Sequence, residues 1–96
     1  MFSTAQIEMK LKTLKPLLAE RFHVSRLAYF GSYGNGQATE SSDLDLLVEF
    51  SKPIGWKFFA LEEYLEQEFK LKIDLVTPNA IKAGFKPSIT ANAHYV

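Results

Sequence analysis

The sequence contains no cysteine, no excess of charge of either sign and no long hydrophobic run. Without cysteine there can be no disulfide, no thiol nucleophile and no cysteine-ligated zinc site. No apolar run approaches the roughly 18 residues that a membrane-spanning helix needs. The first residues, MFSTAQIEMKLK, lack the basic-then-apolar order of a signal peptide. These absences predict a cytoplasmic protein that does not enter a membrane.

The missing basic excess also argues against direct nucleic-acid binding. There are 11 Lys and Arg residues and 11 Asp and Glu residues, so the formal net charge is zero. Proteins that hold nucleic acids by their phosphates usually carry a surplus of Lys and Arg. The acids are nevertheless concentrated in one stretch, because residues 31–50 contain Glu40, Asp43, Asp45 and Glu49 but no Lys or Arg. This stretch predicts a site that a cation or another positive group neutralises.

The length and composition predict one domain over residues 1–96 with a modest core. The chain has 96 residues, of which 47% are hydrophobic and 23% charged, as in ordinary globular proteins. Ser3 and Gln6 have the spacing of a helix capping box. One apolar stripe at helical spacing follows them and extends to Phe22. Pro16 interrupts this pattern, and we therefore expect a kink or a restart of the helix near Thr13.

The rest of the chain alternates between short strands and helices. Strands are expected at 26–30, 44–50 and 72–77, and a helix at 56–70. Residues 79–96 predict one or two short helices broken at Pro87. The pattern is that of an α/β (α+β) domain with a small mixed sheet flanked by helices. Three strands leave exposed sheet edges, and a partner or a second copy of the chain can cover one of them.

The acids of the second strand have a defined geometry. Side chains alternate along a strand, so Asp43 and Asp45 share one face while the leucines between and after them point into the protein. Asp74 is the odd polar residue in the otherwise apolar third strand. If these two strands are neighbours, the three carboxylates Asp43, Asp45 and Asp74 converge.

Converging carboxylates need either protons or a cation. Two like charges about 5 Å apart repel by roughly 3 kcal/mol at an effective dielectric near 20. Oxygen ligands of this kind favour Mg²⁺ or Mn²⁺, with waters and substrate phosphates completing the coordination. Such ions support phosphoryl or nucleotidyl transfer. The glycine-rich turn Gly31–Gly36, with the hydroxyl of Ser32, offers backbone N–H groups that can hold phosphate oxygens.

These residues resemble a known family. Gly31-Ser32, a gap of ten residues and Asp43-Leu44-Asp45 are similar to the GS-x₁₀-DxD signature of the nucleotidyltransferase superfamily that includes DNA polymerase β. Over about residues 14–96 the chain resembles the minimal nucleotidyltransferases (MNT proteins). The resemblance implies a polymerase β palm-like fold. It also implies that Asp43 and Asp45 bind metal, that Asp74 completes the metal site or activates the acceptor hydroxyl, and that Gly31 and Ser32 contact the triphosphate of ATP.

The same resemblance implies a partner. MNT proteins typically act beside a helical HEPN protein as the antitoxin of a toxin–antitoxin pair, transferring AMP from ATP to a tyrosine of the toxin. The chain departs from the family pattern in one respect that argues against full activity. Many members of the family carry a basic residue in the turn, whereas this chain has Tyr33-Gly34-Asn35-Gly36 and no basic residue there. Lys52 or Lys57 can substitute for it. The alternative is a catalytically weak antitoxin that neutralises its partner by binding alone.

Three further side chains, outside the motif, are interpreted as structural or surface residues. His23 and His94 lie far from the motif in the sequence, and we interpret both as structural or surface residues. Trp56 follows a glycine, and we expect it to be exposed, as aromatic side chains at partner surfaces are. A homo- or hetero-oligomer is compatible with these features.

Overall fold

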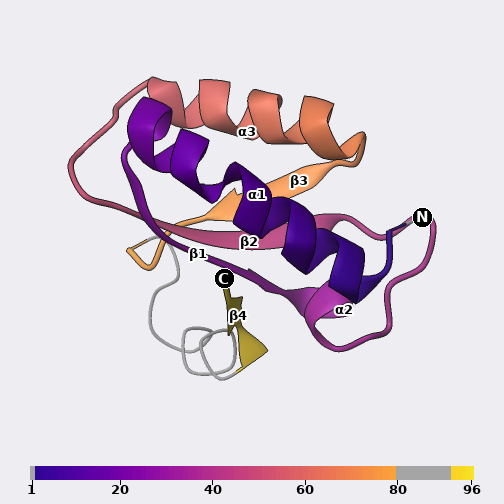
Figure 1. The fold of residues 1–96 in the computed structure, drawn as a ribbon. Coiled ribbons are helices and arrows are strands. Elements are labelled where there is room, and N and C mark those ends of the chain that lie inside the picture. Colours follow the sequence, from indigo (N-terminus) through magenta and orange to yellow (C-terminus); the bar gives the residue numbers. More distant parts are fainter. Residues whose placement is uncertain (1, 80–91) are drawn as a thin grey trace.

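The chain folds as a sheet with two long helices on one face (Figure 1). The structure is a computed structural model, and it describes residues 2–79 and 92–96. The elements, in chain order, are α1 (Thr4–Phe22), β1 (Val24–Phe30), α2 (Gly31–Gly34), β2 (Leu44–Phe50), α3 (Lys57–Phe69), β3 (Ile73–Val76) and β4 (His94–Tyr95). The expected strand at 44–50 has the predicted bounds, and the strands expected at 26–30 and 72–77 and the helix expected at 56–70 differ by one or two residues at their ends.

The sheet is mixed, as the sequence predicts, but it has a fourth strand. The strand order is β3-β2-β1-β4. The two inner strands, β1 and β2, are antiparallel, β2 and β3 are parallel and joined through α3, and β4 lies antiparallel to β1. The prediction of three strands was therefore wrong, because β4 covers the edge of β1. The short helices expected over 79–96 fall mostly outside the described residues, and His94–Tyr95 within that range is a strand.

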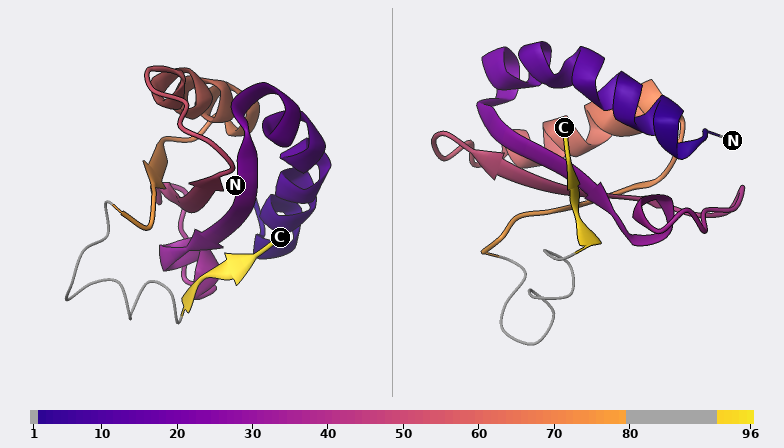
Figure 2. Two further views of the ribbon diagram at one scale, coloured as in Figure 1. Left: turned by 90° about the vertical axis from the view of Figure 1, so that its left-hand side faces the viewer. Right: turned by 60° about the horizontal axis from the view of Figure 1, so that its bottom comes forward.

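The two faces of the sheet differ in what packs on them. Figures 1 and 2 show α1 and α3 side by side over one face. Alternate residues of the strands, including Leu44, Leu46 and Val48 of β2, point to these helices and are fully buried in the main core. The opposite face carries a smaller cluster built around Ala28 and Leu47. Asp45 and Asp74 alternate with core residues, so strand geometry directs them to this second face.

The first helix is capped and packed as its sequence predicts. The Gln6 N–H donates to the Ser3 hydroxyl (3.1 Å) and the Ser3 N–H donates to the Gln6 side chain (2.8 Å), which completes the capping box. The whole apolar stripe is buried against the sheet: Ile7, Leu11, Leu14, Leu18 and Phe22.

Of the two alternatives expected near Thr13, a kink or a restart, the restart was wrong, because α1 continues through Pro16 as one helix. Pro16 itself is exposed. Burial of the stripe on both sides of Pro16 outweighs the one helical hydrogen bond that proline removes.

Two surface features complete the description. Trp56 is 86% exposed, as expected, and its ring contacts that of Phe59 (centroids 5.8 Å apart). Among the described residues, no helix combines the length and the apolar character needed to cross a membrane.

Candidate active site

The glycine turn and the acidic strand meet directly. Gly31 follows the last residue of β1 and has a left-handed φ of 67°. A Cβ atom at this position would collide with the Oδ2 atom of Asp45. Glycine is therefore needed here for two reasons, the backbone conformation and the space that the carboxylate occupies. The carboxylate that lies against the Gly31 backbone belongs to the second acid of the DxD motif.

The turn itself forms one helical turn, α2. The Asn35 N–H donates to the Gly31 carbonyl and the Gln37 N–H donates to the Ser32 carbonyl, both at 2.9 Å. The first N–H groups of any helix have no acceptor within that helix. Groups of this kind suit phosphate oxygens. Ser32 is half-buried at the start of this turn, directly after Gly31.

Asp45 and Asp74 lie opposite each other on neighbouring strands. β2 and β3 are parallel, and their register pairs these two residues. Burial, then the charges of Asp74 and Asp43, and a side-chain hydrogen bond with Asp74 raise the pKa of Asp45 to about 6. Asp45 therefore takes up a proton at a higher pH than an ordinary aspartate does. Asp43 precedes the first residue of β2 and is exposed, as is Asp74.

The chemistry of these residues fits a hard divalent cation. Two carboxylates held together, one with its pKa raised, can be relieved by a proton or by a metal ion. The convergence of all three acids is looser than the sequence analysis expects. In the described part of the chain, no three side chains of metal-binding type surround one point. The structure brings Asp45 and Asp74 together, and Asp43 acts on Asp45 through its charge.

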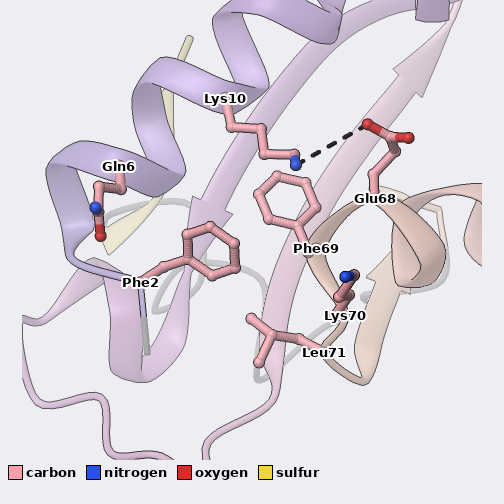
Figure 3. A pocket seen from close by; sticks show the side chains of 7 residues that line it. All are labelled: Phe2, Gln6, Lys10, Glu68, Phe69, Lys70 and Leu71. Atoms are coloured by element: carbon pink, nitrogen blue, oxygen red, sulfur yellow. Dashed lines mark ion pairs between the residues drawn. The ribbon is translucent and has the colours of Figure 1, made fainter.

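A hollow lies elsewhere, between the start of α1 and the end of α3 (Figure 3). It has a volume of about 530 Å³. Phe2 and Phe69 meet there edge to face, with centroids 5.7 Å apart, and Lys10 lies over both rings and 4.0 Å from Glu68. Because α1 and α3 cover the face opposite to Asp45 and Asp74, this hollow is separate from the acidic site.

The proposed substitution of the missing basic residue by Lys52 or Lys57 was wrong. Both lysines follow the far end of β2, whereas the glycine turn lies beside its beginning. A seven-residue strand spans roughly 20 Å. Burial and then the charges of these two lysines lower the pKa of His23, which places them near the end of α1. Neither lysine can stand in for a cation within the turn.

His94 is exposed, as expected for a surface residue, but its side chain also contacts the carbonyl end of the glycine turn. Its Nε2 atom lies 2.9 Å from the carbonyl oxygen of Gly34, although 60 residues separate the two in sequence. Its ring stacks on Tyr29, with centroids 5.1 Å apart. The two-residue strand that carries His94 has no pattern by which the sequence could have revealed it.

A mixed sheet with a glycine turn closing over an acidic strand defines the nucleotidyltransferase class of fold and site. The family model for the nucleotidyltransferase domain matches residues 11–96. The chain belongs to this family and is a nucleotidyltransferase of the minimal type.

Relatives and solved structures agree with this assignment. Protein adenylyltransferase MntA of Thermococcus cleftensis is 41% identical over 97 residues, which cover 100% of this chain and 98% of that protein. A solved candidate minimal nucleotidyltransferase superposes with a TM-score of 0.82 at 26% identity, covering 97% of this chain and 95% of its own. A toxin–antitoxin structure with AMP-PNP has a TM-score of 0.73 at 19% identity, covers 88% of this chain and 69% of its own, and supports the fold alone.

Proposed function

We propose that this chain is a metal-dependent protein adenylyltransferase. It transfers AMP from ATP to a hydroxyl group of a partner protein, a tyrosine of a HEPN-type toxin, and thereby acts as an antitoxin. The observation that carries the proposal is the contact between Gly31 and the Asp45 carboxylate, with Asp74 beside it. This contact brings a phosphate-binding turn and a carboxylate pair to one place. The activity named for the 41%-identical relative supports the same reaction.

Each site residue has a distinct role in this proposal. Asp43 and Asp45 hold Mg²⁺ or Mn²⁺, which would neutralise charge on the transferring phosphate. Gly31 and Ser32 hold the triphosphate through backbone N–H groups and the hydroxyl. Asp74 completes the site and accepts the proton of the acceptor hydroxyl.

The transfer is balanced by the departure of pyrophosphate. The acceptor oxygen forms a bond to the α-phosphorus of ATP as the bond from that phosphorus to the bridging oxygen breaks. The hydroxyl proton passes to Asp74, and pyrophosphate leaves with the electron pair of the broken bond. Because the turn contains no Lys or Arg, a bound Mg²⁺ or Mn²⁺ would supply positive charge beside the phosphates. A cytoplasmic location, where ATP is abundant, is part of this proposal.

The absence of a basic residue from the turn favours one second candidate. A chain that binds its partner but transfers AMP slowly would still neutralise the toxin by covering it. The structure found with a toxin and AMP-PNP is compatible with either role, because its likeness to this chain lies in the fold.

The two candidates separate in one experiment. The partner protein is co-expressed with the wild-type chain, with Asp43→Asn, and with Glu40→Gln, which removes one exposed charge from the neighbouring loop. Intact mass spectrometry of the partner should show added AMP with the wild type and Glu40→Gln, and none with Asp43→Asn. Equal modification with Asp43→Asn would refute the assigned role of the acid. An unmodified partner that still co-purifies with the wild type would favour neutralisation by binding.

A further inference from the structure

The described C-terminal segment packs onto the glycine turn. β4 pairs with β1, with His94 opposite Tyr29 in the register. The Val96 N–H donates to the Leu27 carbonyl (2.9 Å), and the Lys15 ammonium donates to the Val96 oxygen (2.6 Å). These bonds fix the short strand on both β1 and α1. The backbone that carries His94 is therefore held in place by hydrogen bonds to β1 and α1.

The ring of His94 has a fixed orientation. It stacks on the buried ring of Tyr29 with an angle of 18° between the planes. The Tyr29 hydroxyl in turn donates to the Oε2 atom of Glu8 (2.9 Å), and Glu8 pairs with Lys12 (3.0 Å). The Tyr29 ring, on which His94 stacks, is thus held in place by Glu8 of α1. A stacked ring of this kind loses little further freedom when it forms a hydrogen bond.

The hydrogen bond between His94 and Gly34 has a defined direction. A backbone carbonyl only accepts, so the Nε2 atom carries the hydrogen and donates to the Gly34 oxygen at 2.9 Å. The contact is also close. A Cβ atom at Gly34 would lie 3.3 Å from the Asn92 carbonyl oxygen and 3.3 Å from a carbon of the His94 ring. The glycine at this position therefore lets the C-terminal segment reach the turn.

All four carbonyl groups of α2 have partners. The first two accept N–H groups of the loop that follows the helix. The third, at Tyr33, accepts the hydroxyl of Thr4 from α1 (3.1 Å), and the fourth, at Gly34, accepts from His94 of β4. The carbonyl end of the turn is thus tied to elements from both ends of the described chain. Gly31, at the opposite end of the turn, lies against the Asp45 carboxylate.

We propose that His94 is a positioning residue that holds the phosphate-binding turn in its binding-competent orientation. The bond to Gly34 fixes the carbonyl end of α2, and this keeps the N–H end aimed at the triphosphate beside Asp45. The identity of the ligand rests on the proposed function. A turn that is already ordered binds without the loss of freedom that a loose turn suffers. One neutral hydrogen bond corresponds to about a three- to tenfold effect on affinity.

Two substitutions of His94 separate the hydrogen bond from the stacking. His94→Phe keeps a ring on Tyr29 and removes the donor, whereas His94→Gln removes the ring and keeps an N–H donor at a similar reach. Tyr95→Ala is the matched control on the same strand, because the Tyr95 ring lies under Arg26 (4.2 Å) and away from the turn. Binding of AMP-PNP with Mg²⁺ is measured by calorimetry. Amide hydrogen exchange of residues 31–37 is measured without nucleotide, and KM and kcat where transfer is observed.

His94→Phe should weaken AMP-PNP binding about three- to tenfold, raise KM for ATP by a similar factor and speed amide exchange in the turn. The change in kcat should be smaller, because the turn holds the phosphates before and during transfer. His94→Gln and Tyr95→Ala should stay close to the wild type.

The proposal would be overturned if His94→Phe showed the same amide exchange and the same AMP-PNP affinity as the wild type. It would also be overturned if His94→Phe and Tyr95→Ala weakened AMP-PNP binding and sped amide exchange equally. If the wild type binds no AMP-PNP, the proposed function fails, and the exchange rates of the turn still decide the role of His94.

Discussion

Replacing Asp45 by asparagine should stabilise the metal-free protein near neutral pH while removing its activity. Asp45 lies opposite Asp74 on the neighbouring strand, and Asp43 adds a further negative charge nearby. Asparagine has nearly the same shape, and its N–H group can donate to Asp74 as the protonated carboxyl does. The substitution therefore removes the cost of burying a charge and the repulsion from Asp74 and Asp43, and it keeps the hydrogen bond.

The magnitude follows from the pKa of Asp45, which is raised from 3.8 to about 6. A raised pKa means that the folded state binds the proton more tightly than the unfolded state does. The stabilisation from that proton is complete below about pH 4 and is lost as the pH rises through 6. At about 1.4 kcal/mol per pKa unit, the full loss is roughly 3 kcal/mol. Water at this half-buried carboxylate screens part of it, and we expect about 1–2 kcal/mol.

Thermal unfolding in a chelator measures this difference. For a domain of this size, a gain of 1–2 kcal/mol raises Tm by about 5–10 °C. Asp45→Asn should therefore melt about 5–10 °C above the wild type near pH 7.5, and the gap should narrow as the pH falls from 6 to 4. Mg²⁺ should raise the Tm of the wild type more than that of Asp45→Asn, because the ion relieves the same repulsion.

The matched control is Glu40→Gln, which removes one exposed negative charge from the loop before β2. It should leave Tm within a degree or two of the wild type. A lower or unchanged Tm for Asp45→Asn near pH 7.5 would refute the argument, since it would mean that no repulsion is stored at this position. An equal gain in Glu40→Gln would assign the effect to overall charge.

Two further substitutions test the turn and the first helix. Gly36 has a φ of 70°, and a Cβ added there would meet no other atom. Gly36→Ala should therefore lower the free energy of unfolding by about 1–2 kcal/mol through backbone strain alone. Gly31→Ala adds a collision with Asp45, and it should cost more in urea unfolding and reduce transfer at least tenfold. Equal losses in the two variants would contradict the collision. Ser3→Ala removes the capping box of α1 and should lower the free energy of unfolding by about 1 kcal/mol. An unchanged urea midpoint would show that packing alone fixes the start of this helix.

Local patterns in the sequence determined much of the fold and the chemistry. The alternation of Leu44, Asp45 and Leu46 determined which face of β2 is buried, and the Leu- and Val-rich run 44–50 determined its bounds. The capping box and the apolar stripe determined α1 in the same way. The lone acid in the third strand identified Asp74 as a candidate, because a charged side chain among buried ones needs a reason.

Only the tertiary structure decided which of these groups meet. The parallel register of β2 and β3 brings Asp45 against Asp74 and leaves Asp43 at longer range. The length of β2 separates Lys52 and Lys57 from the turn that they were expected to serve. The pairing of β4 with β1 brings His94 to Gly34, 60 residues away. Contacts of this kind depend on how the elements pack and on which strands become neighbours. The packing of elements and the pairing of strands produce no periodic pattern in the sequence, because both depend on residues far apart along the chain.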